Sequence, residues 1–127
     1  MEKMASTAPA PAKGTKYDSA KYRYDLIPSE ATKGLAAVLT FGAFKYEANN
    51  WKLVEDAEIR YYNALARHLS RIKDYLETKD RKYLYDEETG LPETAHILTN
   101  AAFLSHLLRS DITPEMWANA VEVAKNK

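Results

Sequence analysis

Two histidines and an asparagine stand out because they lie in stretches that otherwise show apolar helical spacing. His68 falls within an apolar stripe, and His96 and Asn100 are four residues apart, so they share one helical face. Glu93 lies one turn earlier on that same side. Two antiparallel helices would point these side chains into one inter-helix cavity, where bundles commonly build their sites. We therefore predict that His68, His96 and Asn100 are catalytic.

Each of these histidines also has a simpler interpretation. His68 could be a buried histidine that is hydrogen-bonded only to backbone groups. His68 and His96 with a carboxylate could instead bind a transition metal, although their spacing does not match the H-E-x-x-H signature. The third histidine, His106, falls on a different side of its segment, and we expect it at the surface.

An acidic string, Asp86-Glu87-Glu88-Thr89-Gly90, lies between two helical patterns. The carboxylates of Asp86 and Glu88 are the oxygen ligands that a hard cation such as Mg²⁺ prefers. The alternative is a solvated surface turn, for which this composition is common. The segment from Lys79 to Leu91 is long for a helix connection, and such loops are often functional.

Cations and tyrosines alternate near the start of the chain, over residues 16–25. Such a segment can neutralise phosphates and stack a base, or it can pack its tyrosines on the bundle and leave its charges in water. Further along, Lys45 and Asn50 flank a short loop and could join the same site. The candidates for phosphate contact are Lys16, Lys21, Arg23, Lys45 and Asn50.

Four segments with helical spacing must position these residues: 29–47, 56–78, 92–110 and a last one that begins at Thr113. Ser29 is a plausible N-cap, and Pro92 and Pro114 suit first helical positions. Gly34 and Gly42 would weaken a helix, so we expect them to permit close helix packing. The prediction is an all-α fold, a small helical bundle of about four helices with an irregular N-terminal arm.

Composition narrows the class of protein. The 127 residues fit one domain, which we place at 16–127 after a flexible arm at 1–15 rich in Ala and Pro. With no cysteine, thiolate metal sites and disulfides are excluded. The 18 basic residues balance 18 acidic ones, which argues against nucleic acid as a partner. No apolar run reaches the roughly 18 residues of a membrane span, and no signal peptide is visible, so we expect a cytoplasmic protein without a membrane partner.

Several runs of this sequence together resemble a known family. They are Lys16-Tyr17-Asp18, Arg23-Tyr24-Asp25-Leu26-Ile27-Pro28, Val38 to Ala43, Lys45-Tyr46, Asn49-Asn50-Trp51, Arg67-His68-Leu69, and Asp86 to Pro92 with His96 and Asn100. In order and spacing they resemble the domain named for dATP/dGTP diphosphohydrolases in bacteriophage genomes. The resemblance covers about residues 16 to 108.

This resemblance implies a fold related to the MazG-like all-α nucleotide pyrophosphohydrolases. Those enzymes cut a nucleoside triphosphate between its α and β phosphates, are typically oligomeric, and use Mg²⁺ or Mn²⁺. It then implies that Glu30, Asp86 and Glu88 hold the metal, that the basic residues neutralise phosphates, and that Trp51 or Tyr24 stacks the base. We expect a homo-oligomer that acts on a small nucleotide, in the host cytoplasm if phage-encoded.

The sequence departs from that pattern where the helical carboxylates should be. Glu30 is followed three residues later by Lys33, and His96 and Asn100 stand where acids are expected. Ala20 and Tyr22 replace the usual Gly and Pro, and the Glu55–Glu58 pair lies at the entrance of its segment. Two hypotheses follow: a metal-dependent hydrolase of purine nucleoside triphosphates, or a non-catalytic protein that sequesters a nucleotide. A structural subunit without a ligand is the third.

Overall fold

Four α-helices dominate the structure, a computed structural model that describes residues 14–15 and 21–127. The helices are α1 (Ser29–Lys45), α2 (Ala57–Thr78), α3 (Glu93–Leu107) and α4 (Pro114–Lys125). Short 3-10 turns lie between them: η1 (Tyr24–Leu26), η2 (Asn50–Leu53), η3 (Arg81–Leu84) and η4 (Arg109–Asp111). The described residues contain no strand beyond one isolated bridge between Tyr85 and Pro92. The predicted all-α fold of four helices is confirmed.

Part of the predicted N-terminal region lies outside the described residues. This applies to the flexible arm, apart from Gly14 and Thr15, and to Lys16. Within the part of the chain that is described, no helix is long and apolar enough to cross a membrane.

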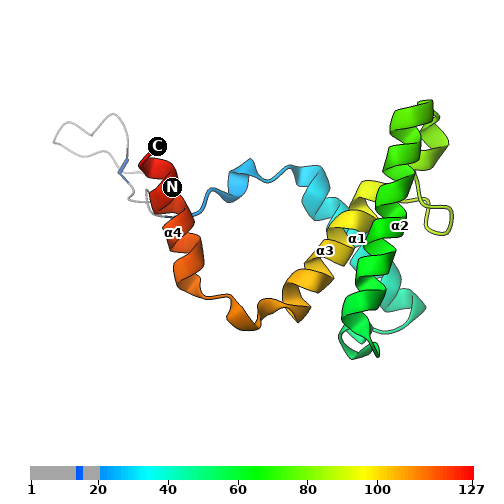
Figure 1. The fold of residues 1–127 in the computed structure, drawn as a ribbon, viewed down its shortest axis with the longest axis horizontal. Coiled ribbons are helices and arrows are strands. Elements are labelled where there is room, and N and C mark those ends of the chain that lie inside the picture. The colour runs from blue at the N-terminus through cyan, green and yellow to red at the C-terminus, as the bar shows by residue number, and fades with distance from the viewer. Residues whose placement is uncertain (1–13, 16–20) are drawn as a thin grey trace, which may run out of the picture.

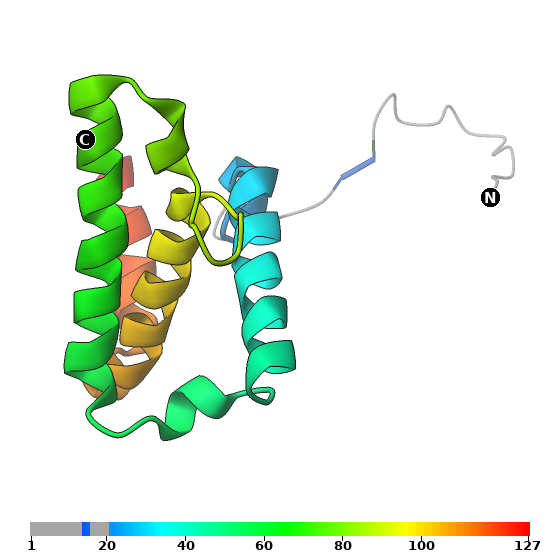
Figure 2. The same cartoon turned by 90° about the vertical axis from the view of Figure 1, so that its right-hand side faces the viewer.

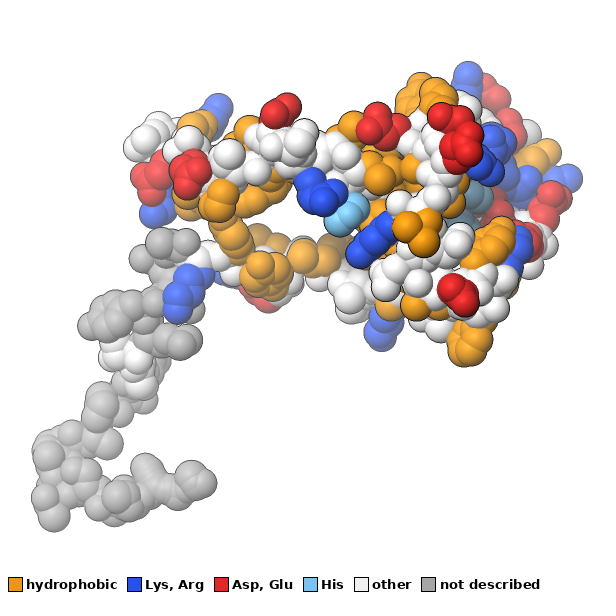
Figure 3. Space-filling view, turned by 90° about the horizontal axis from the view of Figure 1, so that it is seen from below, with side chains coloured by type: hydrophobic (Ala, Val, Ile, Leu, Met, Phe, Trp, Pro, Cys, Tyr) orange, Lys and Arg blue, Asp and Glu red, His pale blue; other side chains and the backbone are white. Residues whose placement is uncertain are grey.

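Helix α3 is the central element, because it packs against both α1 and α2 (Figure 2). Helix α4 lies apart from these three, at the end of an arm that begins after α3 (Figure 1). A space-filling view shows a hollow beside this arm, bordered in part by apolar side chains (Figure 3). The site must therefore be built from α1, α2 and α3.

The helix starts differ slightly from the predicted ones. Pro28 rather than Ser29 occupies the N-cap of α1, and the Ser29 hydroxyl donates to the Glu30 carboxylate at 3.2 Å. Pro92 is likewise the N-cap of α3 rather than its first residue. Both prolines have extended ψ angles, which fits a residue that ends the preceding loop. Pro114 does stand at the start of α4.

The two glycines of α1 have different surroundings. A Cβ built on Gly34 would lie 2.9 Å from Cβ of Ala95, so this glycine lets α1 approach α3 closely, as predicted. A Cβ on Gly42 would meet no described atom within 4 Å. The packing role predicted for Gly42 is therefore wrong, because this residue faces a cavity rather than a neighbouring helix.

The most buried part of the described chain is polar. Glu93 and Thr99 have no exposed surface, and His96 and Asn100 are 7% exposed. Ala95, at 4% exposed, is the one buried apolar residue among those described. All five lie in the first half of α3. Many large apolar side chains stay exposed, with Phe44 at 87% as the extreme.

Candidate functional site

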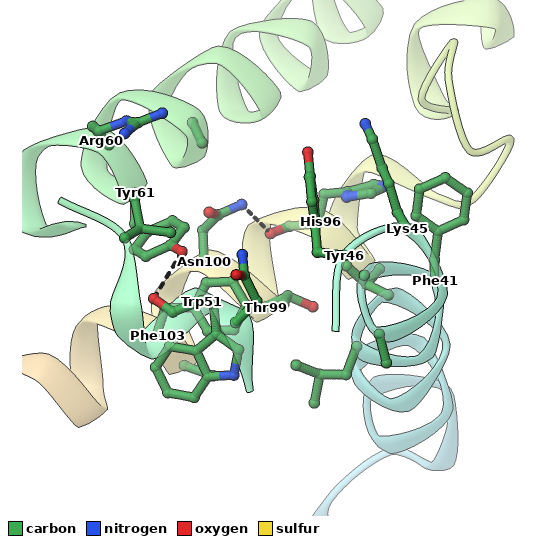
Figure 4. Close-up of a pocket in the computed structure, with 18 of the residues that line it drawn as sticks. Phe41, Lys45, Tyr46, Trp51, Arg60, Tyr61, His96, Thr99, Asn100 and Phe103 are labelled. Atoms are coloured by element: carbon green, nitrogen blue, oxygen red, sulfur yellow. Dashed lines mark hydrogen bonds between the residues drawn. The ribbon is translucent and has the colours of Figure 1, made fainter. Parts of the chain in front are cut away.

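A cavity of about 1090 Å³ lies against α3, between α1 and α2 (Figure 4). Helix α1 contributes its second half, and α2 contributes its first three turns. The η2 segment and the loop at Glu88 and Thr89 complete the lining. This volume suits a small-molecule ligand of nucleotide size.

Two histidines and two carboxylates form a cluster at one end of this cavity, which we call the histidine–carboxylate cluster. The His68 and His96 rings are stacked, with centroids 4.7 Å apart and planes 14° apart. Nδ1 of His68 lies 2.5 Å from Oε1 of Glu93. The Asp86 carboxylate faces a nitrogen of each ring, with Oδ1 3.8 Å from His68 Nδ1 and Oδ2 3.9 Å from His96 Nε2. Three separate segments of the chain thus meet within one site.

Arg71 completes the surroundings of Glu93. Its Nε pairs with the second carboxylate oxygen of Glu93, so both oxygens of this fully buried group are engaged. Its terminal nitrogen Nη2 donates to the carbonyl oxygens of Lys82 (3.1 Å) and Tyr85 (3.0 Å). A buried carboxylate is tolerated only when such partners replace its hydration. Arg71 therefore ties Glu93 and the residues before Asp86 to α2.

The loop that carries Asp86 is closed by its own hydrogen bonds. Oδ2 of Asp86 accepts from the backbone N–H groups of Glu88 (3.0 Å) and Thr89 (2.9 Å). The N–H of Gly90, a residue with φ of 72°, donates to the Asp86 carbonyl oxygen at 2.9 Å. A positive φ suits glycine because it has no Cβ. The loop sequence thus fixes where the Asp86 carboxylate points.

Thr89 links this loop to His96. Its hydroxyl accepts from the N–H of Leu91 at 3.1 Å and lies 2.7 Å from Nε2 of His96. Burial, followed by the neighbouring His68, lowers the pKa of His96 and so favours the neutral imidazole. A neutral His96 can accept a hydrogen bond at Nε2, so the Thr89 hydroxyl is the donor in this pair.

The pKa of Asp86 is lowered despite a contribution in the other direction. Burial raises this pKa, but the backbone N–H groups of Thr89 and Glu88 and the two neighbouring imidazoles together outweigh it. A lowered pKa keeps the Asp86 carboxylate ionised. At the edge of the same cavity, Nζ of Lys45 pairs with Glu88 at 2.5 Å, and this contact raises the pKa of Lys45. The site therefore offers fixed charges of both signs.

The structure brings together part of the predicted site. The cavity is lined by seven of the candidates: Lys45, Asn50, Trp51, His68, Glu88, His96 and Asn100. Asp86 joins them through the two histidines. Asn100 lies one turn from His96, and its Nδ2 donates to the His96 carbonyl oxygen at 2.9 Å. The two helices predicted to lie side by side thus do present their histidines to one cavity.

Other candidates lie on the segment before α1 or at its start, outside the cavity lining: Lys21, Arg23, Tyr24 and Glu30. Arg23 forms an ion pair with Asp25 at 2.7 Å, and Tyr24 is 73% exposed. Glu30 is exposed and accepts from Ser29. None of the four contacts the histidine–carboxylate cluster among the described residues.

Sequence reasoning missed three contributors. Neither Arg71 nor Thr89 was among the predicted site residues. His106 was expected at the surface, yet it is half-buried, lines the cavity, and lies edge-on to Trp51 with ring centroids 5.2 Å apart. That expectation was wrong because η2 folds back onto the last turns of α3 and covers this side. The presence of Trp51 in a predicted loop was the sequence feature that could have indicated this contact.

Three donor atoms of the cluster are close enough together to be candidate metal ligands. One atom each from His68, Asp86 and Glu93 lie within 4.8 Å of one another, a spacing that could hold an ion. One imidazole nitrogen and two carboxylate oxygens form a mixed set, which suits Mn²⁺ better than Mg²⁺. Of the predicted ligands Glu30, Asp86 and Glu88, only Asp86 belongs to this group. Glu93 was noted on the correct helical face but was not chosen as a ligand.

Comparisons with known proteins give one family. A family model described as "dATP/dGTP diphosphohydrolase, N-terminal" matches residues 11–115. A protein of Salmonella phage PMBT28 named "dATP/dGTP diphosphohydrolase" is 29% identical over 110 residues, which are 85% of this chain and 35% of that relative. The chain thus spans about a third of the relative's length. No solved structure matches the chain.

Proposed function

Since the chain belongs to the dATP/dGTP diphosphohydrolase N-terminal family, we propose that its cavity binds a deoxypurine nucleoside triphosphate and hydrolyses it. The products would be the monophosphate and pyrophosphate, in a phage-encoded protein that controls a nucleotide pool. The observation that carries the proposal is the histidine–carboxylate cluster at one end of a nucleotide-sized cavity. The Salmonella phage relative, which is named for this activity, supports it.

A divalent metal, Mn²⁺ or Mg²⁺, is part of this proposal. His68, Asp86 and Glu93 would hold it, with His96 beside them. Such an ion neutralises phosphate charge and makes a bound water more acidic. The choice of these residues rests on their chemistry, since mixed nitrogen and oxygen donors with ionised carboxylates are typical of such sites.

The protein's own residues have separate tasks in this proposal. Lys45 and Arg67 line the cavity and carry positive charge toward the triphosphate. The lowered pKa of His96 favours its neutral form, which can take a proton from the attacking water at Nε2. The hydrogen bond between Nε2 and the Thr89 hydroxyl must break for this transfer. Asn100 supports His96 through its backbone. We assign no role to Lys21, Arg23, Tyr24 or Glu30, because they lie outside the cavity.

A product assay tests the proposal directly. The protein is incubated with each deoxynucleoside triphosphate and Mg²⁺ or Mn²⁺, and monophosphate and pyrophosphate are measured. Asp86→Asn should abolish turnover and leave nucleotide binding measurable by calorimetry, because its charge acts mainly on the transition state. Glu87→Gln is the matched control, since Glu87 is exposed in the same loop and should retain full activity. Turnover that survives Asp86→Asn would contradict the assigned residues.

One observation favours a second function, capture of a nucleotide without catalysis. Both oxygens of Glu93 are already engaged, by His68 and Arg71, which leaves this carboxylate less able to bind a metal. A capture protein would bind a nucleotide at about micromolar Kd or better, some 8 kcal/mol, and release no product. Tight binding without product under either metal would replace the enzyme proposal with this one.

A further inference from the structure

The cavity has an aromatic end, formed by Trp51, Tyr61, Phe103 and His106, in addition to the histidine–carboxylate cluster. Trp51 stacks on Phe103, with ring centroids 4.4 Å apart and planes 20° apart. Tyr61 is tilted against the same phenylalanine at 4.8 Å. The Tyr61 hydroxyl donates to the Trp51 carbonyl oxygen at 2.9 Å, which fixes η2 against α2. All four side chains line the cavity and are only partly buried.

Helix α3 sets the distance between the two ends. His96 and Phe103 are seven residues apart on this helix, which corresponds to about 10 Å at 1.5 Å per residue. Both belong to the lining of one cavity, and Thr99 and Asn100 lie between them (Figure 4). The spacing suits a ligand that is aromatic at one end and strongly anionic at the other.

The polar end supplies the complementary charge. Lys45 and Arg67 line it together with His68 and His96, and Glu88 pairs with Lys45 there. The other two carboxylates of the lining, Glu47 and Glu55, flank the η2 segment. Between the ends, Asn100 uses Nδ2 for the His96 carbonyl oxygen, and its Oδ1 has no hydrogen-bond partner among the described residues. An amide oxygen in this position can accept from a sugar hydroxyl or a base amine.

We propose that the aromatic end is the base subsite, where Trp51 stacks on a purine whose phosphates extend along α3 to the polar end. This inference rests on the proposed function and makes it more specific. It assigns the stacking role to Trp51 and not to Tyr24, which is exposed outside the cavity. It follows that nucleotides bind more tightly than an inorganic polyphosphate of the same charge, because base stacking adds affinity that a polyphosphate lacks.

The first test uses fluorescence in a Trp117→Phe background, where Trp51 is the remaining tryptophan. Titration with dGTP or dATP should change Trp51 fluorescence, whereas inorganic tripolyphosphate should bind without that change. Calorimetry should give tripolyphosphate the weaker Kd, by about tenfold. Nucleotides that bind without affecting Trp51, and no more tightly than tripolyphosphate, would overturn the base subsite and leave the proposed function standing. If neither ligand binds, the proposed function fails as well.

The second test is mutational. Trp51→Leu should weaken dGTP binding about tenfold and leave tripolyphosphate binding unchanged, which also shows that the variant is folded. Trp51→Phe keeps a stacking ring, so its affinity for dGTP should lie between those of the wild type and Trp51→Leu. Tyr62→Leu is the matched control, because Tyr62 is 57% exposed beside Tyr61 and lies outside the cavity lining. Equal losses for dGTP and tripolyphosphate in Trp51→Leu would overturn the inference.

Discussion

Helices α3 and α4 distribute their polar and apolar side chains in opposite ways. The first half of α3 buries a carboxylate, a histidine, a threonine and an asparagine. Helix α4 has no buried residue, and it leaves Met116 48%, Trp117 51% and Val123 58% exposed. Burying polar groups and exposing apolar ones both reduce the stability of an isolated chain.

The difference indicates that the residues of α3 and of α4 are each retained for a purpose other than the stability of the single chain. Polar groups at the centre of a small bundle are retained when they form a site, and each of these has a hydrogen bond or ion pair. An exposed apolar helix is retained when another surface covers it. We therefore propose that α3 serves the ligand and that α4 serves self-assembly, which is the surface that the homo-oligomer expected from the sequence would require.

The largest expected effect is on the buried end of α3. Glu93→Ala should destabilise the protein by about 3 kcal/mol, the low end for a broken buried ion pair, because the half-buried Arg71 would lose its counter-charge. Glu93→Gln keeps the shape and should cost less. Urea denaturation measures both, with Thr94→Ala as a control on the exposed side of the same turn. A loss below about 1 kcal/mol for Glu93→Ala is the size of an ordinary substitution. It would show that the buried ion pair of Glu93 contributes little to the free energy of unfolding.

A glycine pair tests how tightly the buried stretch of α3 is packed. Gly34→Ala places a methyl group 2.9 Å from Cβ of Ala95, and overpacking of about 1–3 kcal/mol should outweigh the gain in helix propensity. Gly42→Ala meets no described atom within 4 Å and should stabilise by up to about 1 kcal/mol. The midpoint of thermal unfolding should therefore fall in Gly34→Ala and rise in Gly42→Ala. Equal stabilisation by both would mean that α1 can move away from α3.

Self-assembly through α4 predicts a change in particle size. Light scattering of the wild type should give a mass above the 14.4 kDa of one chain. Trp117→Lys should lower that mass, because a charge replaces an apolar group in the covered face. Asn119→Ser, an exposed polar change on the same helix, should leave it unchanged. A wild type of 14.4 kDa at high concentration would remove the role that we assign to α4.

The smallest expected effect is the titration of His106. Burial, then the charges of Arg109 and Lys52, lowers its pKa below the ordinary 6.5. The unfolded chain therefore takes up this proton at higher pH than the folded protein does. The contribution of His106 to stability is present above pH 6.5 and is lost as pH falls from there through the folded pKa.

NMR titration of the imidazole signals measures this effect separately from that of His96. The His106 midpoint should lie below 6.5, and Trp51 fluorescence should change with the same midpoint because the two rings are in contact. His106→Asn should abolish that fluorescence change. A midpoint at or above 6.5 would place His106 in water, as the sequence had suggested.

Local patterns were sufficient for the helices and for half of the site. Helical spacing placed His96 and Asn100 on one face, and the acidic string with Gly90 and Pro92 indicated the loop that carries Asp86. The approach of His68 to His96 followed once two neighbouring helices were assumed to be antiparallel. These inferences depend on residues a few positions apart, which is the range over which helical geometry is fixed.

Arg71 shows why the remainder could not be predicted. Its partner Glu93 is 22 residues away, and two further partners are backbone carbonyl oxygens, which no side-chain pattern reveals. A helical wheel places such a residue at the surface. Lys21, Arg23 and Tyr24 illustrate the opposite case, since a run of cations and tyrosines indicates a ligand but does not say where the segment lies.

The two oxygens of Asp86 have different tasks, which bears on the entropy of ligand binding. Oδ2 is held by two backbone N–H groups of its own loop, while Oδ1 faces His68. A ligand at Oδ1 therefore meets a carboxylate whose rotamer and backbone are already ordered, and its binding immobilises fewer torsions than a solvated side chain would require. Because the hydrogen bonds lie within residues 86–91, this preorganisation is encoded by six consecutive residues and could be transferred with them to another helix start.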